Sequence, residues 1–225
     1  MKVLQQQLWH ILILIALVAG VYYYVGIDST LFQGELYGIS TRSWLIITLL
    51  VPILHQIYVL VFWRLELHYQ LITKNLGKHA FGLYKAGFTV LILARPVSLI
   101  CLAISNAWTL DLNPEISYIL SAILLLPPAY LAYSIKKYFG IDRAFGIDHF
   151  QPGKYKDVPM VRKGIFKYSG NAMYVFGFMA LWVPGILLQS KAALLLALFN
   201  HLYIWVHYYF TELPDMKIIY EKEQD

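Results

Sequence analysis

The sequence has few charged side chains and a single cysteine among its 225 residues. Charged residues make up 14% of the chain and hydrophobic residues 59%, with a mean hydropathy of +0.58. These values exclude an ordinary soluble domain and indicate an integral membrane protein. Cys101 has no second cysteine with which to form an internal disulfide or a metal site, so we expect it to be a small core residue.

Several enzyme motifs are also missing. The sequence has no G-x-S-x-G elbow for acyl transfer and no Gly-Lys-Ser/Thr loop for phosphates. His201 and His207 are six residues apart, which places them on different sides of a helix, whereas zinc-binding helices use histidines four residues apart. We therefore predict no metal site. No internal repeat or low-complexity tract is evident.

Long apolar segments are what the sequence does contain. Because backbone groups in hydrocarbon must be satisfied internally, segments of this length are helices. We predict an all-α, polytopic membrane protein with one domain, residues 1–225: four spans in residues 1–135, then a catalytic loop, a helical hairpin and a tail in residues 136–225. The six segments are Leu8–Val25, Trp44–Trp63, Gly87–Ser105, Ile116–Ser134, Met173–Leu188 and Ala192–Phe210.

Two of these segments need comment. Leu8–Val25 ends in three tyrosines and not in small residues, so we expect an uncleaved span and no signal peptide. Only Gln189, Ser190 and Lys191 separate the last two segments, which indicates a tight hairpin, and the first of its two helices is short enough that a full crossing is not required.

Lysine and arginine predict the orientation. Of the 18 such residues, only Arg42 and Lys191 fall in segments on one side, Arg95 lies within a span, and all others fall on the side of the N-terminus. The positive-inside rule then places both termini in the cytoplasm. The net charge of +5 is thus concentrated on one membrane face, where it attracts anionic headgroups, and it does not suggest a nucleic acid partner.

Ionisable residues within apolar segments are the candidates for function. If the last segment continues as a helix past Phe210, His201, Trp205, Tyr208 and Glu212 share one face, and aromatic rings with a carboxylate suit a cationic ligand. Arg95 precedes Pro96 in the third segment. Its guanidinium either pairs with backbone carbonyls or binds a headgroup, and the sequence leaves both open.

The C-terminal third resembles the integral membrane methyltransferases, a family that includes the phosphatidylethanolamine N-methyltransferases and the isoprenylcysteine carboxyl methyltransferases. The resemblance rests on Gly164-Ile165-Phe166, on Asn171-Ala172-Met173-Tyr174 with Gly177, and on Thr211-Glu212-Leu213-Pro214-Asp215 with Tyr220. It covers about residues 140–225. Ala172 replaces a common proline, and Glu212 stands where a pair of glutamates is usual. The Asn-x-Met-Tyr form is more similar to the phospholipid branch.

This resemblance implies an enzyme that uses S-adenosylmethionine, bound at the cytoplasmic ends of the last helices. By resemblance Gly164, Asn171, Tyr174 and Gly177 shape the cofactor pocket. Glu212 contacts the cofactor or aids deprotonation, and His201 is a second candidate base or cofactor contact. Arg95, His149 and Tyr208 are the candidate substrate residues, and Asp148 with His149 is expected to close over the site.

The expected reaction is methylation of a membrane lipid, most simply of a phospholipid amine such as that of phosphatidylethanolamine. Three alternatives stay open on the sequence. They are carboxyl methylation of isoprenylated cysteine, a membrane reductase that uses a nicotinamide cofactor, and a non-catalytic binding or transport protein. The sequence does not indicate an oligomeric state.

Overall fold

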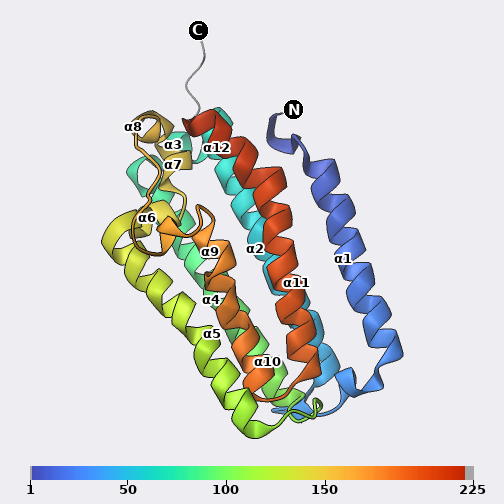
Figure 1. Ribbon diagram of the computed structural model, residues 1–225. Coiled ribbons are helices and arrows are strands. Elements are labelled where there is room, and N and C mark those ends of the chain that lie inside the picture. The colour runs from blue at the N-terminus through green and yellow to red at the C-terminus, as the bar shows by residue number, and fades with distance from the viewer. Residues whose placement is uncertain (1, 221–225) are drawn as a thin grey trace.

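A bundle of long, nearly parallel helices makes up most of the molecule (Figure 1). The computed structural model describes residues 2–220. The ends of the predicted domain, residue 1 and residues 221–225, lie outside the described residues. In that part of the chain five helices are long and apolar enough to cross a membrane: Gln7–Ile27, Thr41–Tyr69, Leu71–Ser105, Pro114–Phe139 and Lys191–Tyr220. The prediction of an all-α, polytopic membrane protein is confirmed.

Most of these spans are composite. The long α-helices are α1 (Gln7–Ile27), α2 (Thr41–Tyr69), α4 (Ala80–Ser105), α5 (Pro114–Ser134) and α11 (Lys191–His207). The remaining α-helices are α3 (Leu71–Leu76), α6 (Ile141–Ala144), α7 (Ile147–Phe150), α8 (Pro152–Tyr155), α9 (Ala172–Val175), α10 (Val183–Leu187) and α12 (Leu213–Tyr220). The 3-10 segments are η1 (Lys2–Leu4), η2 (Ser29–Phe32), η3 (Gly77–His79), η5 (Gly164–Lys167) and η6 (Gly177–Trp182), and the π-helical turns are η4 (Ile135–Phe139) and η7 (Tyr208–Glu212).

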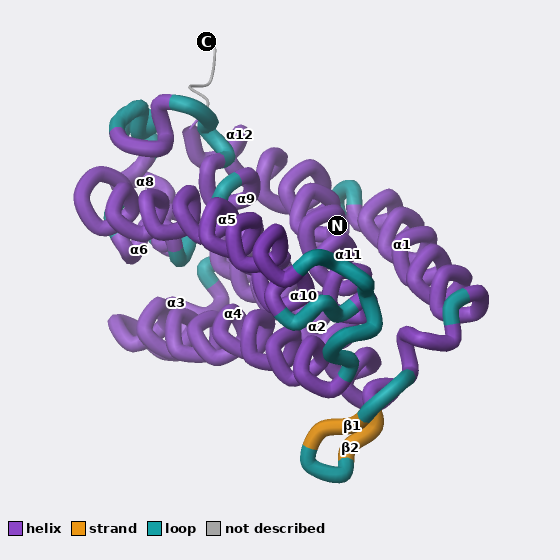
Figure 2. Tube along the Cα trace, turned by 60° about the horizontal axis from the view of Figure 1, so that its bottom comes forward, coloured by secondary structure: helices purple, strands orange, loops and turns teal. Residues whose placement is uncertain are grey.

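Two short strands, β1 (Glu35–Leu36) and β2 (Ile39–Ser40), pair antiparallel between α1 and α2. Figure 2 shows them as a small hairpin that projects from the bundle. We call this the hairpin end of the molecule. The opposite end carries α6, α7, α8 and α12, and we call it the loop end (Figure 1). The first part of residues 136–225, where the sequence predicted a catalytic loop, forms α6, α7 and α8 at this end.

Local sequence explains where the helices begin. Asn113 caps α5, because its Oδ1 accepts from the backbone N–H of Glu115 at 2.8 Å and of Ile116 at 3.3 Å, and Pro114 occupies the first turn. Ser190 caps α11 by accepting from Ala193 N–H at 3.2 Å. Gln189 adopts a left-handed φ of 53°. Gln189 and Ser190 together therefore form the sharp corner of the predicted hairpin between α10 and α11.

The fifth apolar segment differs from its prediction as one helix. The segment Ala172–Leu187 is shorter than a full span and is divided into α9, the 3-10 segment η6 and α10. Pro184 occupies the first turn of α10, where its missing N–H costs nothing. A 3-10 helix rises about 2.0 Å per residue against 1.5 Å in an α-helix, so this short segment gains length along the bundle.

Packing separates an interior from a lipid-facing surface. A buried cluster that includes Leu99, Leu102, Leu196 and Phe199 joins α4 and α11, and α2 packs along α4. By contrast Ile15, Val90 and Leu126, on α1, α4 and α5, are more than half exposed. Large exposed apolar side chains along helices of this length are expected where lipid and not water surrounds the bundle.

Candidate active site

Two adjacent cavities lie between the helices, one near the loop end and one deeper in the bundle. The first has a volume of about 290 Å³ and is bordered by Asp148, His149, Asn171, Tyr208 and Glu212. We call it the loop-side cavity. The second, of about 440 Å³, we call the membrane cavity. Four residues border both cavities and form what we call the partition: Trp63, Ala144, Met173 and Tyr174.

The loop-side cavity is assembled from segments far apart in the sequence. Asp148 and His149 come from α7, Asn171 from the start of α9, and Tyr208 and Glu212 from the π-helical turn η7. A π-helical turn has an extra residue per turn and is frequent at functional sites. Here the turn brings both Tyr208 and Glu212 to one cavity.

A chain of polar contacts fixes the loop helices around this cavity. Arg143 Nη2 donates to the Tyr220 hydroxyl at 3.2 Å, and that hydroxyl donates to Asp148 Oδ2 at 2.8 Å. The other carboxylate oxygen of Asp148 lies 3.0 Å from His149 Nδ1. Burial alone would raise the pKa of Asp148, but the hydrogen bonds from His149 and Tyr220 and the charge of Arg143 outweigh burial and lower it. Asp148 therefore carries a negative charge at neutral pH.

Gly146 allows α7 to approach the partition closely. Its φ is +81°, and a Cβ at this position would lie 2.5 Å from the indole of Trp63. Because no side chain intervenes, the His149 ring stacks on Trp63 with a centroid distance of 3.9 Å. His149 Nε2 lies 3.8 Å from Asp215 Oδ2 and has no hydrogen-bond partner within residues 2–220. One buried polar atom at the cavity thus stays available to a ligand.

The partition carries a hydrogen bond from Tyr174 to Glu212. The hydroxyl of Tyr174 donates to Glu212 Oε2. Tyr174 borders both cavities, whereas Glu212 borders the loop-side cavity and not the membrane cavity. The pair therefore links a carboxylate on one side of the partition to a phenol that also faces the other side.

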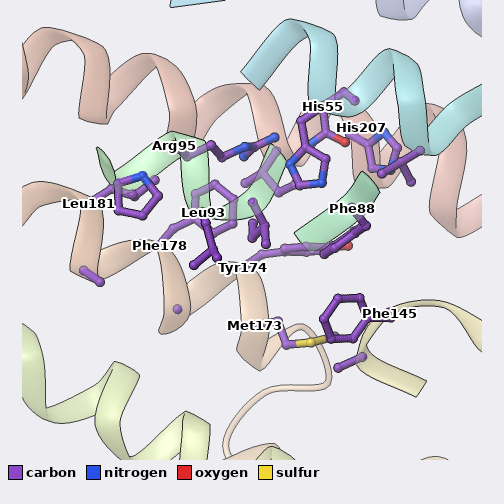
Figure 3. Close-up of a pocket in the computed structure, with 18 of the residues that line it drawn as sticks. His55, Phe88, Leu93, Arg95, Phe145, Met173, Tyr174, Phe178, Leu181 and His207 are labelled. Atoms are coloured by element: carbon purple, nitrogen blue, oxygen red, sulfur yellow. The ribbon is translucent and has the colours of Figure 1, made fainter. Parts of the chain in front are cut away.

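The membrane cavity is enclosed by α2, α4, α5, the α9–η6 segment and α11. Most of its wall is apolar, including Leu93, Leu131 and Phe178, but Arg95, His55 and His207 also line it. Figure 3 shows Arg95, His55 and His207 along one side and Met173 and Phe145 on the opposite side. This combination of an apolar wall with a few ionisable groups suits an amphiphilic ligand.

The structure brings most of the sequence-predicted residues to these cavities. His149, Asn171, Tyr208 and Glu212 border the loop-side cavity, and Tyr174 belongs to the partition. Arg95 and Gly177 border the membrane cavity. The Asn171 side chain does not cap α9, although the backbone carbonyl of Asn171 accepts from Tyr174 N–H at 3.0 Å.

Two predicted residues border neither cavity. The φ of Gly164 is +60°, and a Cβ there would meet Ser134 Oγ at 2.6 Å, so this glycine packs η5 against α5. His201 Nδ1 accepts from Trp182 Nε1 at 3.1 Å. Both residues have local structural roles in the fold, and the geometry does not favour a cofactor contact for either one or a role as base for His201.

Several site residues escaped the sequence analysis. Trp63 and His207 line the cavities, and Arg64 forms a buried ion pair with Asp215, with Nε 3.2 Å from Oδ1. An aromatic residue at the end of an apolar span and an arginine beside it are common at membrane interfaces. The sequence therefore held no signal that Trp63 and Arg64 turn inward.

Residues 2–220 contain no group of three or more His, Cys, Asp or Glu side chains arranged to hold a metal ion. His201 and His207 lie apart, as their spacing predicts, with His207 lining the membrane cavity and His201 bound to Trp182.

Comparison with known proteins identifies the C-terminal part of the chain. No curated protein and no solved structure gave a significant match. The family model described as phospholipid methyltransferase matches residues 116–223. The matched part holds α5, the loop helices, the α9–α11 hairpin and α12, and with them most of the loop-side cavity. Residues 116–223, just under half of the chain, are therefore similar to the phospholipid methyltransferase family, in agreement with the resemblance seen in the sequence motifs.

Proposed function

We propose that the protein transfers a methyl group from S-adenosylmethionine to the amine headgroup of a phospholipid such as phosphatidylethanolamine. One observation supports this most strongly: a cavity bordered by charged side chains and an almost wholly apolar cavity meet at a shared partition. A water-soluble donor and a lipid acceptor need two such compartments with their reactive ends at a common wall.

The loop-side cavity fits the methyl donor by the chemistry of its side chains. S-adenosylmethionine has a positive ammonium and sulfonium, a carboxylate and an aromatic base. Asp148 and Glu212 offer negative charge for the ammonium and the sulfonium, and Arg143 offers a guanidinium for the carboxylate. Tyr208 offers an aromatic face for the base. When bound, the donor supplies an electrophilic methyl group on its sulfonium.

The membrane cavity fits the lipid acceptor. Its walls are apolar over most of their extent, and it lies between α4 and α5, whose outer residues Leu93 and Leu126 are exposed at the lipid-facing surface. Acyl chains can therefore lie against a wall that is apolar like the interior of the bilayer, while the headgroup points toward Tyr174 at the partition.

The proposed reaction requires one proton transfer. The headgroup amine loses a proton, and its nitrogen then forms a bond to the methyl carbon as the bond from that carbon to sulfur breaks. We assign this proton to Glu212 by way of Tyr174, which borders the membrane cavity: the Tyr174 oxygen takes the amine proton as its own hydroxyl proton passes along the hydrogen bond to the Glu212 carboxylate. Trp63, Met173 and Tyr174 border both cavities, and in this proposal they surround the point where the nitrogen meets the methyl carbon and exclude water from it.

The proposed orientation places the loop end in the cytoplasm. Loop-end segments carry Lys85, Arg143 and Lys154, whereas Arg42 and Lys191 lie toward the hairpin end. This distribution supports a cytoplasmic loop end and a cytoplasmic donor site.

A labelled-donor assay tests the proposal. Purified protein in mixed micelles is incubated with S-adenosylmethionine that carries a labelled methyl group, and with phosphatidylethanolamine or a prenylcysteine analogue in separate arms. Thermal unfolding is followed in parallel with S-adenosylhomocysteine or a nicotinamide dinucleotide, and only the former should stabilise the protein. We expect label in the phospholipid. Label released by mild base from the prenylcysteine analogue would instead support carboxyl methylation. Absence of label in every lipid, together with no stabilisation by S-adenosylhomocysteine, would reject a methyltransferase.

A further inference from the structure

Arg95 is a buried charge without a carboxylate partner, and its guanidinium carbon lies 5.5 Å from the centroid of the Phe178 ring. Its side chain is 2% exposed, and Nη2 donates one long hydrogen bond, 3.5 Å, to the carbonyl of Pro52. Its Nε has no hydrogen-bond partner within residues 2–220, and no carboxylate in that range lies within ion-pair distance. A guanidinium has five N–H donors, and burying them without partners is costly.

A second buried arginine shows what this fold provides when an arginine is structural. Arg64 is 1% exposed and donates to the carbonyls of Val3, Gln5 and Phe210 at 2.6 to 3.0 Å, besides its ion pair with Asp215. The protein thus gives one buried guanidinium a carboxylate and several carbonyls, and gives the other only one long hydrogen bond and the face of Phe178. The guanidinium with fewer partners, that of Arg95, lines the membrane cavity.

His55 adds a second open group to the same wall. It is 3% exposed, and neither ring nitrogen has a hydrogen-bond partner in the described part of the chain. Its ring packs edge-on against Phe88 with a centroid distance of 4.6 Å, so the ring is held in place. In Figure 3 the Arg95 side chain extends toward His55 along one side of the membrane cavity. A cation and a neutral N–H donor side by side form a site for an anion.

We propose that Arg95 and His55 form an anion-binding subsite that holds the phosphodiester of the acceptor lipid. This inference rests on the proposed function only in placing that lipid in the membrane cavity. A phosphodiester fits the donors because guanidinium geometry matches phosphate oxygens, and the apolar remainder of the wall accepts the attached chains.

The subsite would also position the reacting group. In an ethanolamine lipid the amine is joined to the phosphate by an ethylene linker, so fixing the phosphate limits where the amine can lie. Tyr174 lines the same cavity as Arg95 and His55. Binding at the subsite therefore directs the amine toward the partition and selects amine lipids that carry a phosphate over those that do not.

A binding experiment tests the subsite without any methyl transfer. Phosphatidylcholine has a phosphodiester and a fully methylated amine, whereas diacylglycerol has the same chains and no phosphate. We expect phosphatidylcholine, and not diacylglycerol, to raise the thermal unfolding midpoint of the wild-type protein in neutral detergent. Arg95→Gln and His55→Gln should each weaken this apparent affinity about 10-fold or more, since each removes a hydrogen bond to a charged group.

His10→Gln is the matched control. His10 is also a buried histidine in a span, but its Nε2 is 3.1 Å from the Tyr203 hydroxyl and it lines neither cavity. We expect normal stabilisation by phosphatidylcholine in this variant. Equal stabilisation by the two lipids, or equal loss in all three variants, would overturn the subsite.

The unliganded protein provides a second test. Because the Arg95 charge is buried without a carboxylate partner, Arg95→Gln should leave the unfolding midpoint of the lipid-free protein unchanged or higher. A clear decrease would mean that Arg95 supports the fold through the Pro52 carbonyl, and would overturn its assignment as an open anion site. The His55→Gln variant then tests separately whether the second side chain of the proposed subsite contributes to phospholipid binding.

Kinetics separate the subsite from the proposed function. With phosphatidylethanolamine we expect Arg95→Gln to raise the KM for lipid about 10-fold or more and to leave the KM for donor unchanged. With a two-chain amine that lacks phosphate, wild type and variant should be equally poor. If no phospholipid is methylated but phosphatidylcholine still binds in an Arg95-dependent way, the subsite stands and the methylation proposal fails.

Discussion

At the scale of single residues, the proposed chemistry depends most directly on Glu212. It is the carboxylate hydrogen-bonded to the partition tyrosine. We expect Glu212→Gln to lower kcat about 10²-fold or more, because an amide cannot accept the proton. Donor binding should also weaken, because the variant loses one of the two negative charges at the loop-side cavity, while lipid binding changes little. Initial rates with labelled donor, together with the unfolding midpoint of the variant, provide the measurement.

Tyr174→Phe and His201→Gln serve as comparisons for that variant. Tyr174→Phe keeps the ring at the partition and loses the hydroxyl, so its activity should fall between wild type and Glu212→Gln. His201 lies outside both cavities and accepts from Trp182. If His201→Gln lost as much activity as Glu212→Gln, the base would be His201, the role that the sequence suggested.

The last helix explains why the sequence grouped His201 with Glu212. A regular α-helix places residues eleven apart on one face, and α11 follows this geometry as far as His207. The π-helical turn Tyr208–Glu212 then inserts extra backbone per turn, which rotates later residues relative to earlier ones. His201 and Glu212 nevertheless both face the Ala172–Trp182 segment, since Trp182 donates to His201 and Tyr174 donates to Glu212. Periodicity could not show that His201 lies too far along that segment to border either cavity.

At the scale of elements, the ion pair between Arg64 and Asp215 joins α2 to α12. Both side chains are 1% exposed, and the two nearest atoms are 3.2 Å apart. Removing one partner leaves a buried charge unpaired, so we expect Asp215→Asn to lower the free energy of unfolding by about 3 to 5 kcal/mol. Denaturant unfolding of the purified protein measures this.

Asp142→Asn is the control for the same type of contact at the surface. Asp142 pairs with Lys85 at 2.6 Å, but the two side chains are 53% and 36% exposed. An exposed pair contributes about 1 kcal/mol at most, so this variant should unfold almost like the wild type. If Asp142→Asn and Asp215→Asn lowered the free energy of unfolding by comparable amounts, the buried pair would stabilise the packing of α12 no more than an exposed pair does.

The length of the apolar segments predicted the positions of the helices that span the bundle. Each of the four N-terminal segments and the last one lies within a long helical span, because hydrocarbon requires internally satisfied backbone. The segment Met173–Leu188 is as apolar, yet it breaks into α9, η6 and α10. Hydropathy does not distinguish α from 3-10 geometry, and the choice depends on how the segment packs against α5.

The ion pair between Arg64 and Asp215 could not be predicted from the sequence for a different reason. Arg64 and Asp215 are 151 residues apart, and nothing local marks them as partners. Arg95 could be singled out because an arginine in an apolar span is rare, but its lack of a carboxylate partner is visible only once the neighbouring helices are in place.

At the scale of the whole molecule, orientation is the open prediction. In a Cys101→Ser background, single cysteines are placed at Glu35 in the hairpin and at Lys156 beyond α8, both exposed positions. With a membrane-impermeant maleimide on intact cells we expect label at position 35, and label at position 156 only after permeabilisation. The reverse pattern would place the loop end outside the cytoplasm.

The partition has a consequence for successive rounds of reaction. In the proposed arrangement, donor and acceptor enter from adjacent cavities that meet at Trp63, Met173 and Tyr174, so a spent donor would leave without displacing the lipid. An amine that has gained one methyl group would then still lie at the meeting point when a fresh donor arrives. The proposal thus implies processive methylation, in which one lipid undergoes several additions before it returns to the bilayer.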